Sequence, residues 1–324
     1  MNIRRRICGT LAASLALGPL AAFAQRSRPA RVGWLSYLPE PDPALGLLQE
    51  GLRNLGHVEG KSYVLIARYA KNDFTRLPAL VQELAAERLD VLVSRGPSVD
   101  FTKSVRDRIP VVFVYSGDPV IAGFADSLAK PGRNMTGLTF MAMELCAKRV
   151  EVLKDLLPDA KRIALLSNPE HTGELLEYRV TEDTARRLGA EVTRHLVHKP
   201  EELAPAFAVF RAAKFDAILV FPDSLTLNRR KEIAELAAQT RIPCMYGWTE
   251  FVEAGGLVSY GPSLADGFRM LAVFADKVLK GGNASTIPIE QARSISLTLN
   301  ITAAKALGMK IPPTLLARVD RIIQ

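Results

Sequence analysis

Polar side chains stand where short apolar runs of the sequence end, and these residues could bind a ligand or carry out chemistry. In chain order they are Ser36, Tyr37, Gly96, Pro97, Ser98, Ser116, Asp118, Asn168, Asp223, Tyr246 and Trp248. In an open α/β sheet, ligands bind beyond the carboxyl ends of the strands, beside helix N-termini that offer free N–H groups. The set combines small hydroxyls, two acids and aromatics, which suits a small zwitterion.

Each residue type has its own role in such a site. Helix-start N–H groups and the hydroxyl of Ser98 can bind a carboxylate, Asp118 can pair with an ammonium group, and aromatic rings can cover a side chain. Capping is the alternative, because Ser and Asp before a helix are first of all N-caps, worth about 1 kcal/mol each. Either role accounts for Ser98, Asp118 or Asp223. Trp34 lies inside the first apolar run, where we expect core packing.

The elements that must position these residues follow an alternation of strands and helices. The expected strands of a first set cover 31–37, 63–69, 90–94 and 110–116, and those of a second set cover 162–168, 190–197, 216–223 and 243–248. Amphipathic stretches between them predict helices. A helix over 264–279, an extended stretch over 287–300 and a last helix from Thr302 complete the chain. We predict an α/β protein of two doubly wound parallel-sheet lobes, with more than one crossing between them.

Length and composition agree with two lobes. Single hydrophobic cores stop growing at about 250 to 300 residues, and this chain has 324. Its residues are 48% hydrophobic and 23% charged, which is typical of a folded globular protein and not of a disordered or fibrous one.

The first residues form a signal-peptide pattern. Arg4, Arg5 and Arg6 precede an apolar run over 7–24, which ends in Ala22-Phe23-Ala24. A permanent anchor is the alternative, but Gly18-Pro19 would break its helix. Cleavage after Ala24 would leave 300 residues (324 − 24) in the periplasm, with the export route, including the twin-arginine route, left open.

The net charge gives little support to nucleic-acid binding. The chain carries 42 Lys and Arg against 34 Asp and Glu, a formal charge of +8, and removal of the three N-terminal arginines leaves +5. The remaining basic residues form no stripe with interleaved aromatics. We expect neither nucleic-acid binding nor a membrane partner from charge alone.

Common catalytic and cofactor motifs are missing. The first strand has no G-x-G-x-x-G after it, and the chain has no phosphate-binding G-x-x-x-x-G-K-[ST] and no G-x-S-x-G elbow. His195 and His198 would point to opposite faces of a strand, so we expect surface histidines, with no metal and no cofactor. Cys146 and Cys244 are expected to be buried thiols, with a disulfide between them as the alternative.

Several segments carry a resemblance to a known family. They are GLRNLGHVEGKSYVLIARYA (51–70), RLPALVQELAAERLDVLVSRGPS (76–98), PVVFVYSGDPV (110–120), SLAKPGRNMTGLTF (127–140), FVEAGGLVSYGPSLADGFR (251–269) and AKALGMKIPPTLLARVDRII (304–323). The sequence resembles the extracytoplasmic substrate-binding proteins of ABC transporters with the type I periplasmic-binding fold, in the branch related to tryptophan- and tyrosine-binding components.

The resemblance implies a non-catalytic protein that closes on a small-molecule ligand by a hinge with three crossings. Lobe 1 would comprise 27–138 plus about 262–292, and lobe 2 139–261 plus about 293–324. It places the ligand at the strand-end residues above, with Thr139 and Tyr260 near the crossings. The implied partners are an ABC permease and ATPase, and we expect a monomer.

One departure from the family bears on the ligand. The family usually has Ser-Gly-Thr-Pro-Ala after the third strand, whereas this chain has Ser94-Arg95-Gly96-Pro97-Ser98. Proline lacks an N–H, so the carboxylate end would be held differently, or the ligand would not be an amino acid. Two other functions stay open: a periplasmic ligand sensor for a membrane receptor, and an exported enzyme with Asp118 or Asp223 as general base.

The zwitterion hypothesis predicts the effect of Asp118→Asn. We expect amino-acid binding to weaken by about 1.5 to 3 kcal/mol, the worth of a charge-assisted hydrogen bond, while folding stays nearly intact. Calorimetric titration measures the dissociation constant, and an unchanged value would remove Asp118 from the site.

Overall fold

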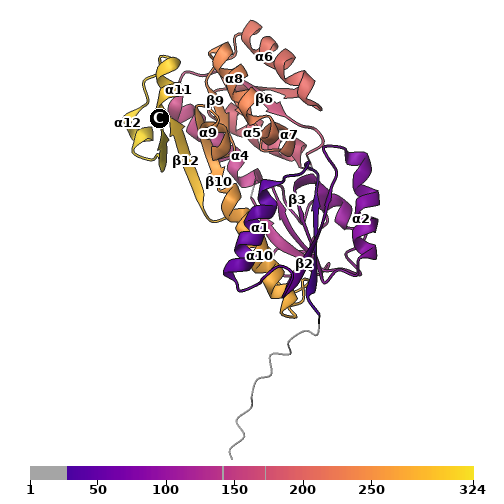
Figure 1. The fold of residues 1–324 in the computed structure, drawn as a ribbon. Coiled ribbons are helices and arrows are strands. Elements are labelled where there is room, and N and C mark those ends of the chain that lie inside the picture. The colour runs from indigo at the N-terminus through magenta and orange to yellow at the C-terminus, as the bar shows by residue number, and fades with distance from the viewer. Residues whose placement is uncertain (1–27, 141, 172) are drawn as a thin grey trace, which may run out of the picture.

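The computed structural model describes residues 28–140, 142–171 and 173–324. The expected signal peptide over 1–24 lies outside these ranges. Figure 1 shows two lobes, each built on a sheet with helices on both faces, stacked end to end.

The first sheet has six parallel strands in the order β11-β5-β4-β3-β1-β2. Its strands are β1 (Ala30–Ser36), β2 (Tyr63–Tyr69), β3 (Val91–Arg95), β4 (Val111–Tyr115), β5 (Met135–Thr139) and β11 (Glu290–Gln291). The central strands are rich in valine and are fully buried, as expected for a parallel sheet covered on both faces.

The second sheet has seven strands in the order β13-β12-β10-β9-β8-β6-β7. They are β6 (Arg162–Ser167), β7 (Glu191–Leu196), β8 (Ala217–Val220), β9 (Cys244–Tyr246), β10 (Val258–Pro262), β12 (Ile295–Asn300) and β13 (Arg321–Ile323). Only the β10–β12 pairing is antiparallel among the described strands. The prediction of two parallel-sheet α/β lobes is confirmed.

Helices cover both faces of each sheet. Those beside the first sheet are α1 (Pro43–Asn54), α2 (Leu77–Ala86), α3 (Val99–Thr102) and α10 (Leu264–Leu279), with short turns η1 (Phe74–Arg76) and η2 (Gly96–Ser98). Those beside the second are α4 (Ala142–Leu156), α5 (Glu174–Arg187), η3 (Pro200–Glu202), α6 (Leu203–Ala212), α7 (Ser224–Asn228), α8 (Arg230–Thr240), α9 (Thr249–Glu253), α11 (Ile301–Ala306) and α12 (Pro313–Leu316). No described helix is long and apolar enough to span a bilayer.

The apolar cores follow the two faces of the strands. In the first lobe α1 and α10 pack together over one face, where Trp34 is fully buried as predicted, and α2 and α3 cover the other. In the second lobe α4 and α5 cover one face and α6 and α8 the other. One cluster contains core residues of both lobes and runs through Leu227, Leu264 and Phe268, so the lobes are joined by apolar packing as well as by the chain.

Between the sheets, the chain crosses after β5, after β10 and after β11. Thus α10 returns to the first lobe, β11 adds to the first sheet, and β12 adds to the second. The extended stretch predicted over 287–300 is therefore two short strands in different sheets. The last helix predicted from Thr302 is α11, which ends at Ala306, and the chain continues through α12 into the edge strand β13.

The close contact between Gly137 on β5 and Phe113 on β4 predicts how a substitution changes the free energy of unfolding. Gly137 lies in β5 with φ +152°, and a Cβ there would be 1.9 Å from the carbonyl oxygen of Phe113 on β4. Gly137→Ala should lower the free energy of unfolding by about 2 to 4 kcal/mol through overpacking and strain. Gly46→Ala in α1 is the matched control, since a Cβ there meets nothing within 4 Å and should stabilise the helix by about 0.5 to 1 kcal/mol. Urea denaturation measures both, and equal effects would contradict the account.

Candidate functional site

The carboxyl ends of the strands in the two sheets face each other, and side chains from both lobes meet there. A Cβ at Gly96, which follows β3, would lie 3.0 Å from Oγ of Ser224 at the start of α7. Tyr37, which follows β1, has its pKa raised first by burial and next by the charge of Asp223. The ends of β1 and β3 in the first lobe therefore approach the end of β8 in the second.

The facing strand ends of the two lobes form the two walls of a cleft. In the first lobe, Asp42 organises this wall. Its side chain is fully buried and caps α1 by accepting the N–H of Ala44 at 3.1 Å. Ser36 donates its hydroxyl to Asp42 at 2.6 Å, and Arg95 donates Nη1 to it at 3.2 Å. One carboxylate thus fixes the end of β1, the end of β3 and the start of α1.

In the second lobe, Asp223 and Asn168 join the strand ends that face the first lobe, and these ends are the second wall. Nδ2 of Asn168 donates to Oδ1 of Asp223 at 3.0 Å, and the N–H of Leu225 donates to the same oxygen at 2.7 Å. Asp223 also forms a capping box with Thr226 at the start of α7. The ends of β6 and β8 are held together by this pair.

His171 and Glu177 form a buried ion pair in the second lobe, close enough to Asp223 for its charge to act on His171. Nε2 of His171 is 2.9 Å from Oε1 of Glu177, and both side chains are nearly inaccessible. Burial opposes the charge on His171, but the charge and hydrogen bond of Glu177 outweigh it and raise the pKa of His171 to about 9. His171 is therefore a cation at neutral pH.

Two cavities open at the junction of the lobes. One, of about 180 Å³, lies between Asp42 and Arg95 of the first lobe and Leu227 and Glu250 of the second, with Phe268 of α10 at its side. The other, of about 20 Å³, is lined by Gly117, Asp118, Thr139, Glu144 and Gln291, among others.

Several buried polar atoms around the cleft have no hydrogen-bond partner within the described ranges. In the first lobe these are Nε of Arg95 and Oγ of Ser98, which is fully buried. In the second lobe Oε2 of Glu250 is another. An unsatisfied buried polar group costs about 1 to 3 kcal/mol, and a ligand or water that bonds to such a group removes this cost.

The remaining first-lobe residues predicted from the sequence are placed as follows. Pro97 is in the η2 turn with Gly96 and Ser98, and Ser116 is half-buried at the end of β4. Asp118 caps the next turn by accepting the N–H groups of Val120 and Ile121 at 2.7 and 3.2 Å. Thr139 donates its hydroxyl to the carbonyl of Gly117 at 2.8 Å, which ties β5 to that turn.

Three aromatic side chains predicted for the site pack within the second lobe. Trp248 is 4% exposed and starts α9. Nε of Arg149 donates a hydrogen bond to the carbonyl oxygen of Tyr260 at 2.9 Å, and the ring of Tyr260 packs on the α4 side of the sheet. Tyr246 is fully buried and stacks on Phe251.

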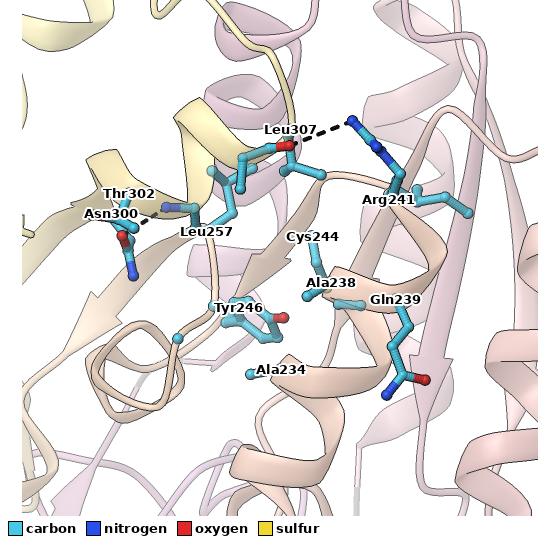
Figure 2. Close-up of a pocket in the computed structure, with 16 residues that line it drawn as sticks. Ala234, Ala238, Gln239, Arg241, Cys244, Tyr246, Leu257, Asn300, Thr302 and Leu307 are labelled. Atoms are coloured by element: carbon cyan, nitrogen blue, oxygen red, sulfur yellow. Dashed lines mark hydrogen bonds between the residues drawn. The ribbon is translucent and has the colours of Figure 1, made fainter.

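Tyr246 lines a separate pocket of about 540 Å³ at the amino edge of the second sheet, away from the first lobe. Figure 2 shows this pocket between α8 and α11, with Tyr246 and Cys244 at its base and Leu257 and Leu307 at its side. The ring of Tyr246 therefore points back into the second lobe, even though its backbone lies at a strand end.

The cysteines and His198 lie where the sequence predicted, whereas His195 does so only in part. Cys146 and Cys244 are buried cysteines outside any disulfide, as predicted, and burial raises the pKa of each to about 12. His198 is exposed, whereas the prediction of a surface position for His195 is wrong in part, because its ring packs edge-on against Phe210 and Phe215 and its Nε2 is buried. No group of His, Cys, Asp and Glu suited to a metal ion occurs in 28–140, 142–171 or 173–324.

Sequence reasoning missed Asp42, Arg95, Glu250 and the His171–Glu177 pair. Asp42 precedes Pro43, a signal for a helix start, and Arg95 stands beside the strand-end glycine. Those signals were available. Nothing local distinguishes Glu250 from the exposed Glu253 one turn later in the same helix.

Comparison with known proteins decides the family. Residues 41–323 match the family described as ABC transporter substrate binding protein. The chain belongs to this family. This substrate-binding protein is 23% identical over 274 residues to a tyrosine-binding protein of Clostridioides difficile, covering 84% of this chain and 78% of that one.

Solved structures share its fold. An ABC domain from Streptococcus pneumonia in complex with L-Trp matches with a TM-score of 0.82 at 22% identity, over 91% of this chain and 100% of the other. A conserved domain protein of Vibrio cholerae matches with a TM-score of 0.80 at 25% identity, over the same shares. The predicted periplasmic-binding type I fold and the predicted family are confirmed.

The His171–Glu177 pair predicts a pH dependence of stability. Because the pKa of His171 rises from about 6.5 when unfolded to about 9 when folded, its contribution is complete below about pH 6.5 and is lost as the pH rises to about 9. Its size is on the order of 3 kcal/mol. His171→Gln should therefore flatten the stability profile of the substrate-binding protein between these pH values, measured by urea denaturation.

The exposed His198 provides the control for that experiment. His198→Gln should keep the wild-type profile, since His198 is solvent-exposed. A His171→Gln profile that runs parallel to the wild-type one would mean that His171 does not take up a proton on folding.

Proposed function

We propose that this substrate-binding protein captures a small polar or aromatic metabolite, an amino acid or a related carboxylate, between its lobes. In this proposal it works in the periplasm as a monomer and delivers the ligand to an ABC permease and its ATPase. The tyrosine and L-Trp named for two of its relatives favour an amino acid with an aromatic side chain.

The observation that carries the proposal is the unpaired hydroxyl of Ser98, in the turn that follows β3. Oγ of Ser98 is fully buried and lacks a partner among the described residues. It follows the Gly96 turn that faces Ser224 of the other lobe. A ligand carboxylate at this position would accept the hydrogen bond that the protein leaves unmade.

The fold supports capture by closure of the lobes. We propose that the moving units are 27–138 with about 262–292, and 139–261 with about 293–324. The connections after β5, β10 and β11 would then act as the hinge. Ligand that contacts both walls stabilises the closed form because it binds that form better than the open one.

A thermal-shift screen tests the proposed function. The panel is the twenty common L-amino acids together with aromatic carboxylic acids, each incubated with the purified chain. A ligand at 100 times its dissociation constant should add about 2.7 kcal/mol to the free energy of unfolding and raise the melting temperature. A panel that yields no stabilising solute would contradict the proposal.

Ser98→Ala makes the test specific for the cleft. It should weaken binding by about 0.5 to 3 kcal/mol, the worth of one hydrogen bond to a neutral or charged acceptor. Ser104→Ala is the matched control, because Ser104 is exposed and bonds only to the carbonyl of Phe101 in the described structure. Calorimetric titration should show wild-type affinity for this control.

A further inference from the structure

The cavity of about 180 Å³ between the lobes contains charged side chains from both of them. Asp42 and Arg95 come from the first lobe, and Arg230 and Glu250 come from the second. Leu227 and Phe268 supply apolar walls. Because the cavity is formed by both lobes, a group bound in it would stabilise their closed arrangement.

Arg95 presents a donor that the protein does not use. Its side chain is 9% exposed, its Nη1 donates to Asp42, and its guanidinium lies 4.7 Å from the centre of the Phe268 ring. Nε has no acceptor within the described ranges. The ion pair with Asp42 and the stacking on Phe268 hold the guanidinium in place, so Nε is a fixed donor.

Glu250 presents an acceptor that the protein does not use. It lies in the first turn of α9, and its Oε2 is buried without a donor among the described residues. Burial raises the pKa of the Glu250 carboxyl, which indicates that no neighbouring group fully compensates its charge. A cationic group beside Oε2 would supply that compensation.

The charges of the cavity select between ligand classes. Asp42 and Glu250 balance Arg95 and Arg230, so these four side chains sum to zero. A simple carboxylate would add an unbalanced negative charge and leave Oε2 of Glu250 without a donor. A zwitterion adds no net charge and offers both a carboxylate for the donor and an ammonium group for the acceptor.

We propose that Arg95 and Glu250 determine the ligand class of the interlobe site, with Nε of Arg95 donating to the carboxylate and Oε2 of Glu250 accepting from the ammonium group of a zwitterionic amino acid. This assignment rests on the proposed function. It gives the ammonium group to Glu250 and not to Asp118, whose Oδ1 is occupied by two N–H groups beside a cavity of only about 20 Å³.

Paired ligands that differ by the ammonium group test the assignment. The probes are L-tyrosine, L-tryptophan and L-phenylalanine, each compared by calorimetric titration with its deaminated acid, the matching 3-arylpropanoate. The variants are Glu250→Gln and Arg95→Lys, the second of which keeps a positive charge for Asp42 but removes the Nε donor. Glu253→Gln in the same helix and Arg108→Met at an exposed site are the matched controls.

We expect the wild-type chain to bind at least one of these amino acids at least tenfold more tightly than its deaminated acid. Glu250→Gln should remove most of that preference, whereas Arg95→Lys should weaken amino acid and acid by similar factors of at least tenfold. Both controls should bind as the wild type does. Thermal unfolding of each variant without ligand shows that it is folded.

Other outcomes separate the two proposals. Wild-type amino-acid binding that Glu250→Gln and Arg95→Lys leave unchanged overturns the assignment and leaves the proposed function standing. A loss on Asp118→Asn but not on Glu250→Gln does the same, as does a wild-type preference for the deaminated acids. Failure of the wild type to bind any solute, in this set or in the wider panel, overturns both proposals.

Discussion

Buried polar atoms at the facing strand ends are the constraint on which the rest of this structure depends. Parallel strands end in loops and helix starts, and each brings N–H, hydroxyl and charged groups to the same edge. Two such edges face each other, so burial of one by the other removes water from both. Groups such as the hydroxyl of Ser98 and Oε2 of Glu250 are then left without partners among the described residues. In the proposed function, a ligand between the lobes supplies these partners.

In each wall of the cleft, one buried carboxylate accepts hydrogen bonds from several groups and so joins them. Asp42 joins Ser36, Arg95 and the start of α1, and Asp223 joins Asn168 and the start of α7. These carboxylates are acceptors for several donors at once, so their own charge is compensated without a ligand. Each of these hydrogen-bond networks therefore lies within one lobe and needs no group from the other lobe.

The sequence was informative about the positions of strand ends because apolar runs and their termini are local features. It therefore located the loops at Ser36, Gly96, Asn168 and Asp223 that the structure brings to the cleft. The sequence could not show which way the side chain of Tyr246 points, and its ring stacks on Phe251 within the second lobe. That direction depends on how a three-residue strand packs between α8 and its neighbours, which is a tertiary effect.

The charged residues of the cleft were missed for a related reason. Arg95 and Asp42 are 53 residues apart, and Glu250 and Arg95 belong to different lobes. A charge at a strand end or in the first turn of a helix is usually solvated, so only the packing of one lobe against the other reveals that these side chains are shielded from solvent. The family resemblance supplied the two-lobe architecture but not these residues.

Binding of a ligand between the lobes can be tested by a crystal structure of the chain grown with the tightest-binding solute of the panel. We expect electron density for the solute between the lobes, with its carboxylate near Oγ of Ser98 and contacts to residues of both walls. Density only in the pocket between α8 and α11, or on one lobe alone, would contradict it.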